Sequence, residues 1–159
     1  MSDSVSSSKL PLPLDHFLCF AIYSANHSMN RAYKPFLADL NLTYPQYIVM
    51  VALWEKDGQT VKSLGETLFL ASNTLTPLLK RLEKMGHVTR QRDPNDERQV
   101  VIYLTPQGQA LEEKAINIPE CILAATGLTP DNIEYLQAQL SHLRQNLEAA
   151  TETNTHIET

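Results

Sequence analysis

Apolar residues recur every three or four positions along most of this chain, a spacing that predicts a mainly helical protein. The first such stretch runs from Leu14 to about Leu40. Pro45 suits the first turn of a second helix, which is expected to end near Lys56, before the turn-forming pair Asp57-Gly58. The next two helices are predicted in TVKSLGETLFLA and SNTLTPLLKRLEKMG, where the leucines of the second form a stripe that a core would bury.

Pro77 limits where the fourth of these helices can begin. With Asn73 or Thr74 as N-cap, the proline lies in the first turn and costs little. With Ser72 as N-cap, the same proline removes a backbone hydrogen bond. The sequence leaves the two registers open.

Strand-forming residues replace the helical spacing between residues 87 and 105. Val88–Arg90 and Val100–Leu104 are strand-like, and the turn residues DPND lie between them, so a β-hairpin with a charged tip is predicted. Pro106 then opens a helix to about Thr126, in which Pro119 is expected to cause a kink.

The last predicted helix begins at Thr129-Pro130 and has the 3-4-3-4 apolar repeat of a helix that packs along another helix. That repeat consists of Ile133, Leu136, Leu140, Leu143 and Leu147. This repeat and the apolar face of 14–40 are both long for one protomer to cover, which indicates a dimer. The alternative is that the two faces pack on each other within the chain.

The predicted fold class is mainly α with a small β-hairpin, arranged as a winged helix-turn-helix with N- and C-terminal dimerisation helices. A single protomer is expected over 13–150, with a disordered arm at 1–12 and a flexible tail at 151–159. Within it, 60–105 would form the winged helix-turn-helix. The ranges 13–40 and 107–150 would form the dimerisation helices.

The formal net charge of −5 argues by itself against nucleic acid as a partner. The basic residues are concentrated, however, since Ser72 to Arg92 holds five Lys or Arg and one Glu. A basic island in an acidic chain indicates a surface that faces phosphate. The sequence also has no run of eighteen apolar residues and no secretory signal, so a cytoplasmic protein with reduced cysteines is expected.

The second helix of the predicted pair has the residue types that DNA recognition requires. Small polar side chains at its exposed start can reach base edges, the basic residues after them can bind backbone phosphates, and hairpin arginines can enter the minor groove or clamp the backbone. These candidates are Ser72, Asn73, Thr74, Thr76, Lys80, Arg81, Lys84, Arg90, Arg92 and Arg98. The alternative is that the charged residues form only a solvated helix face.

Cys19 lies on the apolar side of the first predicted helix, and Tyr23 lies one turn further on. A lone cysteine there is either a buried packing residue, a metal ligand or a redox sensor. The five histidines have no ligand spacing and Cys121 is about a hundred residues away, so neither a metal nor another cofactor is expected. A sensor would need a stabilised thiolate, access for an oxidant and a group that resolves the product.

Five segments of the chain resemble a known family: LCFAIY at 18–23, AYKPFL at 32–37, LTYPQY at 42–47, TLTPLLKRLE at 74–83 and DERQVVIYLT at 96–105. They resemble the MarR family of winged-helix dimers, and within it the organic hydroperoxide resistance regulators of the two-cysteine subclass. The resemblance extends from about Leu14 to Leu123, and Asp96 with Arg98 matches the D-x-R signature of the family's wing. Ala71 departs from the pattern, because some relatives have an acidic residue there, so operator contacts can differ.

The resemblance implies a homodimeric repressor that binds a pseudo-palindromic operator when reduced. It implies that Cys19 is the peroxidatic sensor, that Tyr23 lies beside it, and that Tyr33 and Tyr44 reach it from the other subunit. An organic hydroperoxide would convert the thiolate to sulfenic acid. Cys121, at the position of the second cysteine in that subclass, would resolve it as an intersubunit disulfide; the alternative for Cys121 is a small core residue.

Two other functions stay open at this point. The first is a MarR-type repressor that a small aromatic or phenolic ligand releases, with structural cysteines. The second is a thiol peroxidase that uses Cys19, although the chain has no CxxC motif and no arginine close to Cys19 in sequence. The expectation is a regulator and not an enzyme.

Overall fold

The computed structural model describes residues 12–155, which form two compact units divided between Ile118 and Pro119. The described part is mainly helical and has one small antiparallel sheet, as predicted. Most of the arm predicted at 1–12 lies outside the described residues, as does the end of the tail predicted at 151–159.

The first unit begins with a short 3-10 helix, Leu14–His16, followed by helix α1, Leu18–Leu40. The prediction of one continuous helix from Leu14 was therefore wrong at its start, because Phe17 has an extended backbone (φ −80°, ψ 122°). The end at Leu40 is confirmed, since Asn41 adopts the left-handed conformation that commonly ends a helix.

Helix α2, Tyr44–Glu55, starts with a capping box. The backbone N–H of Thr43 donates to Oε1 of Gln46 at 2.8 Å, and the N–H of Gln46 donates back to Oγ1 of Thr43 at 3.4 Å. Pro45 lies in the first turn, as predicted, where its missing N–H costs nothing.

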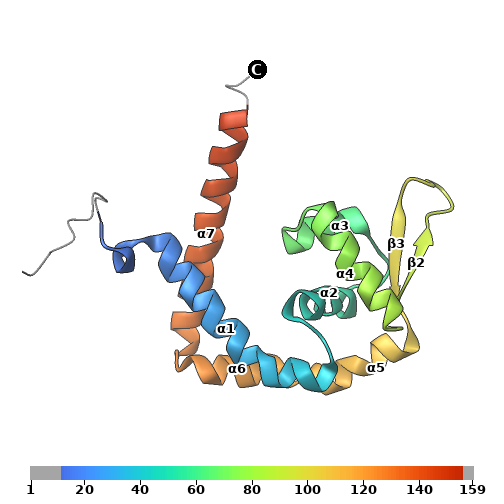
Figure 1. Ribbon diagram of the computed structural model, residues 1–159, viewed down its shortest axis with the longest axis horizontal. Coiled ribbons are helices and arrows are strands. Elements are labelled where there is room, and N and C mark those ends of the chain that lie inside the picture. Colours follow the sequence, from blue (N-terminus) through green and yellow to red (C-terminus); the bar gives the residue numbers. More distant parts are fainter. Residues whose placement is uncertain (1–11, 156–159) are drawn as a thin grey trace, which may run out of the picture. The chain divides into compact units, whose positions relative to one another are not determined.

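The winged helix-turn-helix follows within the same unit (Figure 1). It consists of β1 (Gln59–Thr60), α3 (Val61–Leu68), α4 (Ser72–Lys84), β2 (Val88–Arg92) and β3 (Val100–Leu104). The strands are antiparallel in the order β1-β3-β2, so the predicted hairpin is confirmed and a third strand is added to it. The prediction missed β1 because two residues carry no alternation pattern.

Helix α4 begins one residue earlier than any of the predicted registers. Its N-cap is Ala71, which provides no side-chain cap, and Pro77 therefore lies inside the helix. Because proline has no N–H, the carbonyl of Asn73 one turn back lacks its helical donor.

The core of the first unit lies where α2, α3 and α4 pack on one another and on β2 and β3. The apolar stripe of α4 contributes Leu75, Leu79 and Leu82, which are at most 1% exposed. The remaining side chains of this fully buried set are Val49, Met50, Leu53, Leu64, Val88 and Ile102.

Helix α5, Pro106–Ala115, is fixed to the sheet at Gly108. A Cβ built on Gly108 would lie 2.0 Å from the carbonyl oxygen of His87, so only glycine fits there. The backbone oxygen of Gly108 also accepts a 3.0 Å hydrogen bond from Nε1 of Trp54.

The second unit holds most of α6, Ile118–Thr126, and all of α7, Pro130–Thr155. The prediction of one kinked helix from Pro106 to Thr126 was wrong, because the chain leaves the helix at Ile116 and Asn117 and Pro119 lies in the first turn of α6. Helix α7 starts where predicted, at the Thr129 cap, and continues to Thr155.

His87 gives this fold a pH dependence that can be measured. It is 6% exposed, its Nδ1 has no hydrogen-bond partner among the described residues, and burial lowers its pKa from 6.5. Below about pH 6.5 His87 takes up a proton more readily in the unfolded chain than in the folded chain, so the free energy of unfolding decreases as pH falls. Above that pH, His87 makes no pH-dependent contribution to the free energy of unfolding. We expect the urea midpoint of the parent to fall between about pH 7.5 and 5.5 by more than that of His87→Phe, which does not titrate. Equal shifts in the two proteins would assign the pH dependence to other groups.

Candidate functional site

The start of α4 presents small polar side chains to solvent. Ser72, Asn73 and Thr74 are exposed, and Thr76 is half-buried. The hydroxyl of Thr76 donates to the carbonyl of Ser72 at 2.7 Å, so this hydroxyl keeps only its acceptor capacity for a ligand. The basic residues Lys80, Arg81 and Lys84 are all exposed further along the helix.

The tip of the hairpin is organised by Asp96. Its Oδ1 accepts a hydrogen bond from the backbone N–H of Arg98 at 3.1 Å, and its Oδ2 accepts one from Nε2 of Gln99 at 3.0 Å. Asp96 therefore shapes the turn that carries Arg98, whose side chain is exposed, as is that of Arg92. A carboxylate would be repelled by a phosphate, which fits a structural part in the wing better than direct contact with DNA.

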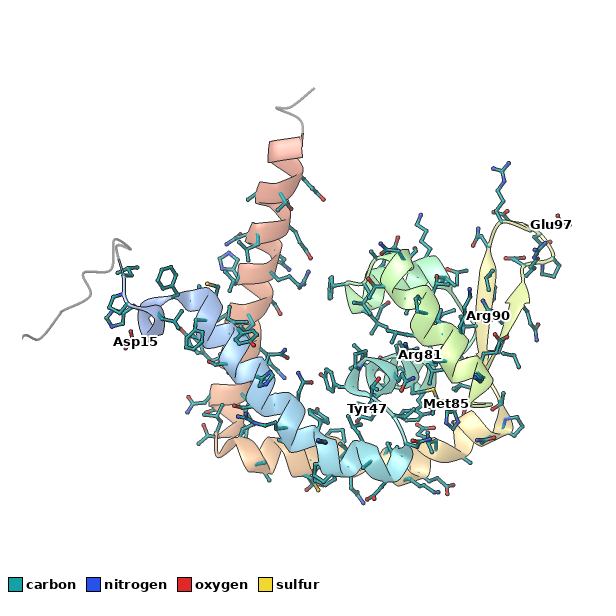
Figure 2. All side chains as sticks on the ribbon, in the orientation of Figure 1. Asp15, Tyr47, Arg81, Met85, Arg90 and Glu97 are labelled. Carbon is teal, nitrogen blue, oxygen red and sulfur yellow. The ribbon has the colours of Figure 1, made fainter. Side chains whose placement is uncertain are left out.

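Arg90 is held within the protein by an ion pair. Its Nε donates to Oε2 of Glu83 on α4 at 2.7 Å, and the two side chains are only 30% and 37% exposed. Figure 2 shows Arg90 on the hairpin beside α4, while Glu97 lies at the tip. The pair joins the wing to α4, so Arg90 is less available to DNA than Arg92 and Arg98.

A groove of about 430 Å³ separates the wing from the first turns of α3 and α4. It is lined by two residues of the candidate set at the start of α4, Ser72 and Thr76, and by Arg98 of the wing. It also brings in Thr60, Lys62 and Gln99, which the sequence did not single out because they belong to neither the polar start of α4 nor the arginines of the hairpin.

Cys19 lies in the first turn of α1, and its side chain is exposed within one chain. Tyr23 follows one turn later and is 63% exposed. The ring of Tyr23 stacks on His27, with ring centroids 5.8 Å apart and planes 24° apart. Cys19 is therefore not a packing residue of its own protomer, which was one of its three alternatives.

Tyr33 and Tyr44 come together where α1 meets α2. Their ring centroids lie 4.9 Å apart, and Tyr47, which the sequence analysis did not select, lies 5.8 Å from Tyr33. The pKa of Tyr33 is raised to about 12, first by desolvation and then by the neighbouring hydroxyls of Tyr44 and Tyr47. Burial also raises the pKa of Tyr44, so both phenols stay protonated near neutral pH and can donate hydrogen bonds to an anion.

These tyrosines cannot reach the cysteine of their own chain along α1. Fourteen residues separate Cys19 from Tyr33, and at 1.5 Å per residue they are about 21 Å apart along the helix. If Tyr33 and Tyr44 contact a Cys19, it belongs to a second copy of the chain.

Cys121 lies in the first turn of α6, and its side chain is exposed. It belongs to the second unit and Cys19 to the first. Cys121 is therefore not a core residue within one chain, although a small core residue was its alternative explanation.

Large apolar side chains remain exposed on α1 and α7. On α1 only Leu37 and Leu40 are buried, whereas Leu18, at 62%, Ile22 and Met29 are exposed. On α7 the exposed members of the leucine repeat are Leu136, Leu140 and Leu147. Apolar surface of this extent on two long helices is typical of a protein interface. Among residues 12–155, no helix combines the length and the apolar character needed to cross a lipid bilayer.

Residues 31–115 match the family model described as transcriptional regulator SarA/Rot. Two curated relatives match over most of the chain. One is the HTH-type transcriptional regulator TtmR of Methylorubrum extorquens, 50% identical over 139 residues, which covers 87% of this chain and 71% of the relative. The other is the organic hydroperoxide resistance transcriptional regulator of Bacillus subtilis, 44% identical over 136 residues, which covers 86% of this chain and 92% of the relative.

Solved structures of AbfR from Staphylococcus epidermidis have the same fold. The overoxidized form bound to DNA aligns with a TM-score of 0.70 at 39% identity and covers 82% of this chain and 91% of AbfR. The disulfide form aligns with a TM-score of 0.59 at 41% identity and covers 79% and 88%. The MarR-type winged helix predicted from the sequence is therefore confirmed.

Proposed function

Because this chain belongs to the SarA/Rot family of MarR-type winged-helix transcriptional regulators, we propose that it is a homodimeric repressor that organic hydroperoxides release from operator DNA. The observation that carries this proposal is an exposed Cys19 near the start of α1, far along that helix from Tyr33 and its neighbour Tyr44 on α2, two protonated tyrosines that only a second copy can bring to it. The relative from Bacillus is named for organic hydroperoxide resistance, and AbfR has been solved in reduced, overoxidized and disulfide forms. We place the regulator in the cytoplasm, where the two thiols are reduced at rest.

The first chemical step is attack of the Cys19 thiolate on the peroxide. The sulfur takes the terminal OH group, the O–O bond breaks, and the alkoxide takes up a proton and leaves as an alcohol while Cys19 becomes sulfenic acid. Tyr33 and Tyr44 of the partner subunit, with Tyr23 on the same helix, would donate hydrogen bonds to the thiolate. The apolar surfaces of Leu18 and Ile22 around Cys19 would favour an organic peroxide over hydrogen peroxide.

The second step is resolution by Cys121. Its thiolate attacks the sulfenic sulfur of Cys19 in the partner subunit, the S–O bond breaks as the disulfide forms, and the hydroxide takes up a proton and leaves as water. An intersubunit disulfide would fix the two protomers at a different spacing from that of the reduced dimer. A dimer whose recognition helices are shifted by a few ångström cannot engage half-sites one helical turn, about 34 Å, apart.

One contact joins the tyrosine cluster to the recognition helix within each protomer. Tyr44 lies in the first turn of α2, and Gln46 in the same turn donates from Nε2 to Sδ of Met85 at 3.9 Å. Met85 is the C-cap of α4, and its carbonyl accepts a hydrogen bond from Nε2 of Gln107 on α5. A displacement of Tyr44 can therefore be passed through α2 to the end of the helix that contacts DNA.

The DNA-binding set is assigned by exposure. Asn73 and Thr74 would contact base edges, Lys80, Arg81 and Lys84 would contact phosphates, and Arg92 and Arg98 would act from the wing. Arg90 and Asp96 would hold the wing in place through their bonds to Glu83 and to the turn.

The two arginines Arg98 and Arg90 provide a matched pair for this assignment. We expect Arg98→Ala to weaken operator binding by about 1–3 kcal/mol, because its exposed side chain is free to enter the minor groove. Arg90→Ala should instead lower the free energy of unfolding, because it leaves Glu83 half-buried without its partner. Titration of fluorescent duplex and urea denaturation of both variants measure the two effects. Unchanged DNA affinity in Arg98→Ala would remove the wing tip from the DNA contact.

A second candidate function is favoured by a groove of about 760 Å³ on the surface of α1 and the start of α2, lined by Leu37, Leu42 and Tyr44 among others. A small aromatic or phenolic ligand would fit such a surface, and it would leave the cysteines structural. The two functions differ in the behaviour of Cys19→Ser, because only the redox repressor loses its response to peroxide.

A further inference from the structure

We propose that the groove between the wing and the first turns of α3 and α4 binds one backbone phosphate of DNA, and that Lys62 contacts this phosphate. The inference rests on the proposed binding of operator DNA and adds to it a residue outside the candidate set. The groove has a volume of about 430 Å³, and three elements that are far apart in the sequence supply its walls.

The charge of the groove fits a phosphate. Lys62 and Arg98 are its two charged lining residues, and none of the lining residues is acidic. Lys62 is 85% exposed and lies 4.0 Å from Glu66, a surface pair one helical turn apart that constrains the ammonium group weakly. The ammonium group can therefore leave Glu66 for an anion in the groove.

Neutral hydrogen-bonding groups line the rest of the proposed phosphate site. The hydroxyl of Ser72 lies on the α4 side, and the amide of Gln99, oriented by its bond to Oδ2 of Asp96, lies on the wing side, whereas Thr76 only lines the wall because its hydroxyl donates to the carbonyl of Ser72. The first turn of α4 has no side-chain cap, so no side-chain oxygen occupies the N–H groups of Ser72 and Asn73, whereas the N–H of Thr74 donates to the carbonyl of Ala71. By contrast, α3 has a side-chain N-cap, because Oγ1 of Thr60 accepts a hydrogen bond from the backbone N–H of Ser63.

The position of the groove identifies the phosphate as part of DNA. In a winged-helix complex the recognition helix enters the major groove and the wing reaches the neighbouring minor groove. The sugar-phosphate backbone is what separates these two grooves. A strand that passes between α4 and the wing must therefore lie over this groove, while Asn73 and Thr74 remain free for base edges.

The first test compares Lys62→Met with Lys114→Met, which removes the same charge from an exposed site on α5 outside the groove. The probes are a duplex selected by the parent protein from random DNA and an unrelated duplex. We expect Lys62→Met to bind both duplexes about fivefold more weakly and to reduce the slope of log Kd against log salt by about 1 between roughly 50 and 200 mM. Lys114→Met should match the parent.

The second test locates the phosphate. Single methylphosphonate linkages, which have no charge, are placed in turn along the selected duplex. We expect one linkage in each half-site to weaken binding of the parent by about fivefold and to have no further effect on Lys62→Met, because the same contact is already lost. Circular dichroism and the urea midpoint establish that Lys62→Met is folded, as expected for a change at a side chain that is 85% exposed.

Two results would contradict the proposed phosphate site. One is equal DNA affinity and salt slope for Lys62→Met and Lys114→Met, and the other is a methylphosphonate profile that Lys62→Met leaves unchanged. A third arm adds inorganic phosphate at constant ionic strength; stronger competition than by chloride, lost in Lys62→Met, would support the proposal, because free phosphate would displace the DNA phosphate from the same groove. A parent protein that selects no duplex would contradict the proposed repressor itself, so the two failures are distinguishable.

Discussion

Replacement of Cys19 by serine will leave the proposed repressor bound to its operator in the presence of an organic hydroperoxide. In the parent, oxidation is expected to weaken operator binding by a factor of roughly 5 to 150, the range typical of coupled sites. Serine has nearly the same shape but cannot be oxidised, and Cys19 is exposed in one chain, so the reduced-state affinity should be unchanged. Electrophoretic mobility of a selected duplex, before and after treatment with cumene hydroperoxide, measures both values.

Cys121→Ser is the matched control for the second step. Its Cys19 should still be oxidised to sulfenic acid, which a dimedone adduct detects by mass spectrometry, but no disulfide should form. On a non-reducing gel the treated parent should run at the mass of a dimer, and both Cys→Ser variants at the mass of a monomer. This result would establish the sensor, the resolving residue and the intersubunit pairing together.

Two outcomes would contradict the redox mechanism. If peroxide released Cys19→Ser from DNA as readily as the parent, the thiol would not be the sensor and release by a small aromatic ligand would be the better function. If the parent consumed many equivalents of peroxide per Cys19 with a thiol reductant, the protein would be acting as a thiol peroxidase. Consumption of one equivalent is expected of a switch.

Gly108→Ala will cause the largest loss of stability that the described residues indicate for a single methyl group. The added Cβ would lie 2.0 Å from the carbonyl oxygen of His87 and 2.9 Å from its carbonyl carbon, and backbone atoms cannot yield as a flexible side chain does. To relieve the clash, α5 must move away from β2. That movement also strains the bond from Thr105 N–H to His87 and the bond from Trp54 to Gly108.

We expect this change to lower the free energy of unfolding by on the order of 3 kcal/mol and the melting temperature by roughly 10 °C. Gln109→Ala, at the exposed neighbouring position, is the control and should stay within about 0.5 kcal/mol of the parent. Urea denaturation followed by tryptophan fluorescence is a direct measurement, because Trp54 donates to Gly108. Equal midpoints for the two variants would show that α5 is not held against the sheet in this way.

Periodicity predicted helix α4 because it has one buried stripe. The stripe of α4, Leu75, Leu79 and Leu82, could be found in the sequence since the burial of these side chains follows the 3.6-residue turn. Pro45 and the left-handed Asn41 also lie at helix boundaries that local chemistry determines. The hairpin could be predicted for the same reason, because DPND favours a turn without help from distant residues.

Local patterns failed where a contact distant in sequence decides the structure. The two-residue strand β1 exists because Gln59 and Thr60 pair with Ile102 and Val101. The start of α4 at Ala71 puts Pro77 inside the helix, a cost that the packing of Leu75 and its neighbours against the core offsets. The ion pair that makes Arg90 less available to DNA could not be predicted either, because its partner Glu83 lies on a facing helix.

The amino-acid sequence by itself determined the order of the elements, the basic island, the polar start of the recognition helix and the two cysteines, because each depends on residue type and spacing along the chain. Only the tertiary structure decided which charges are paired across elements, as Arg90 is with Glu83. It also decided that Lys62, Thr76 and Arg98, from three separate elements, line one groove. It also brought Tyr33 and Tyr44 to one place and left Cys19 about 21 Å away along α1. A helix is stiff, so that separation persists in one chain, and contact between the cysteine and these tyrosines requires a second copy.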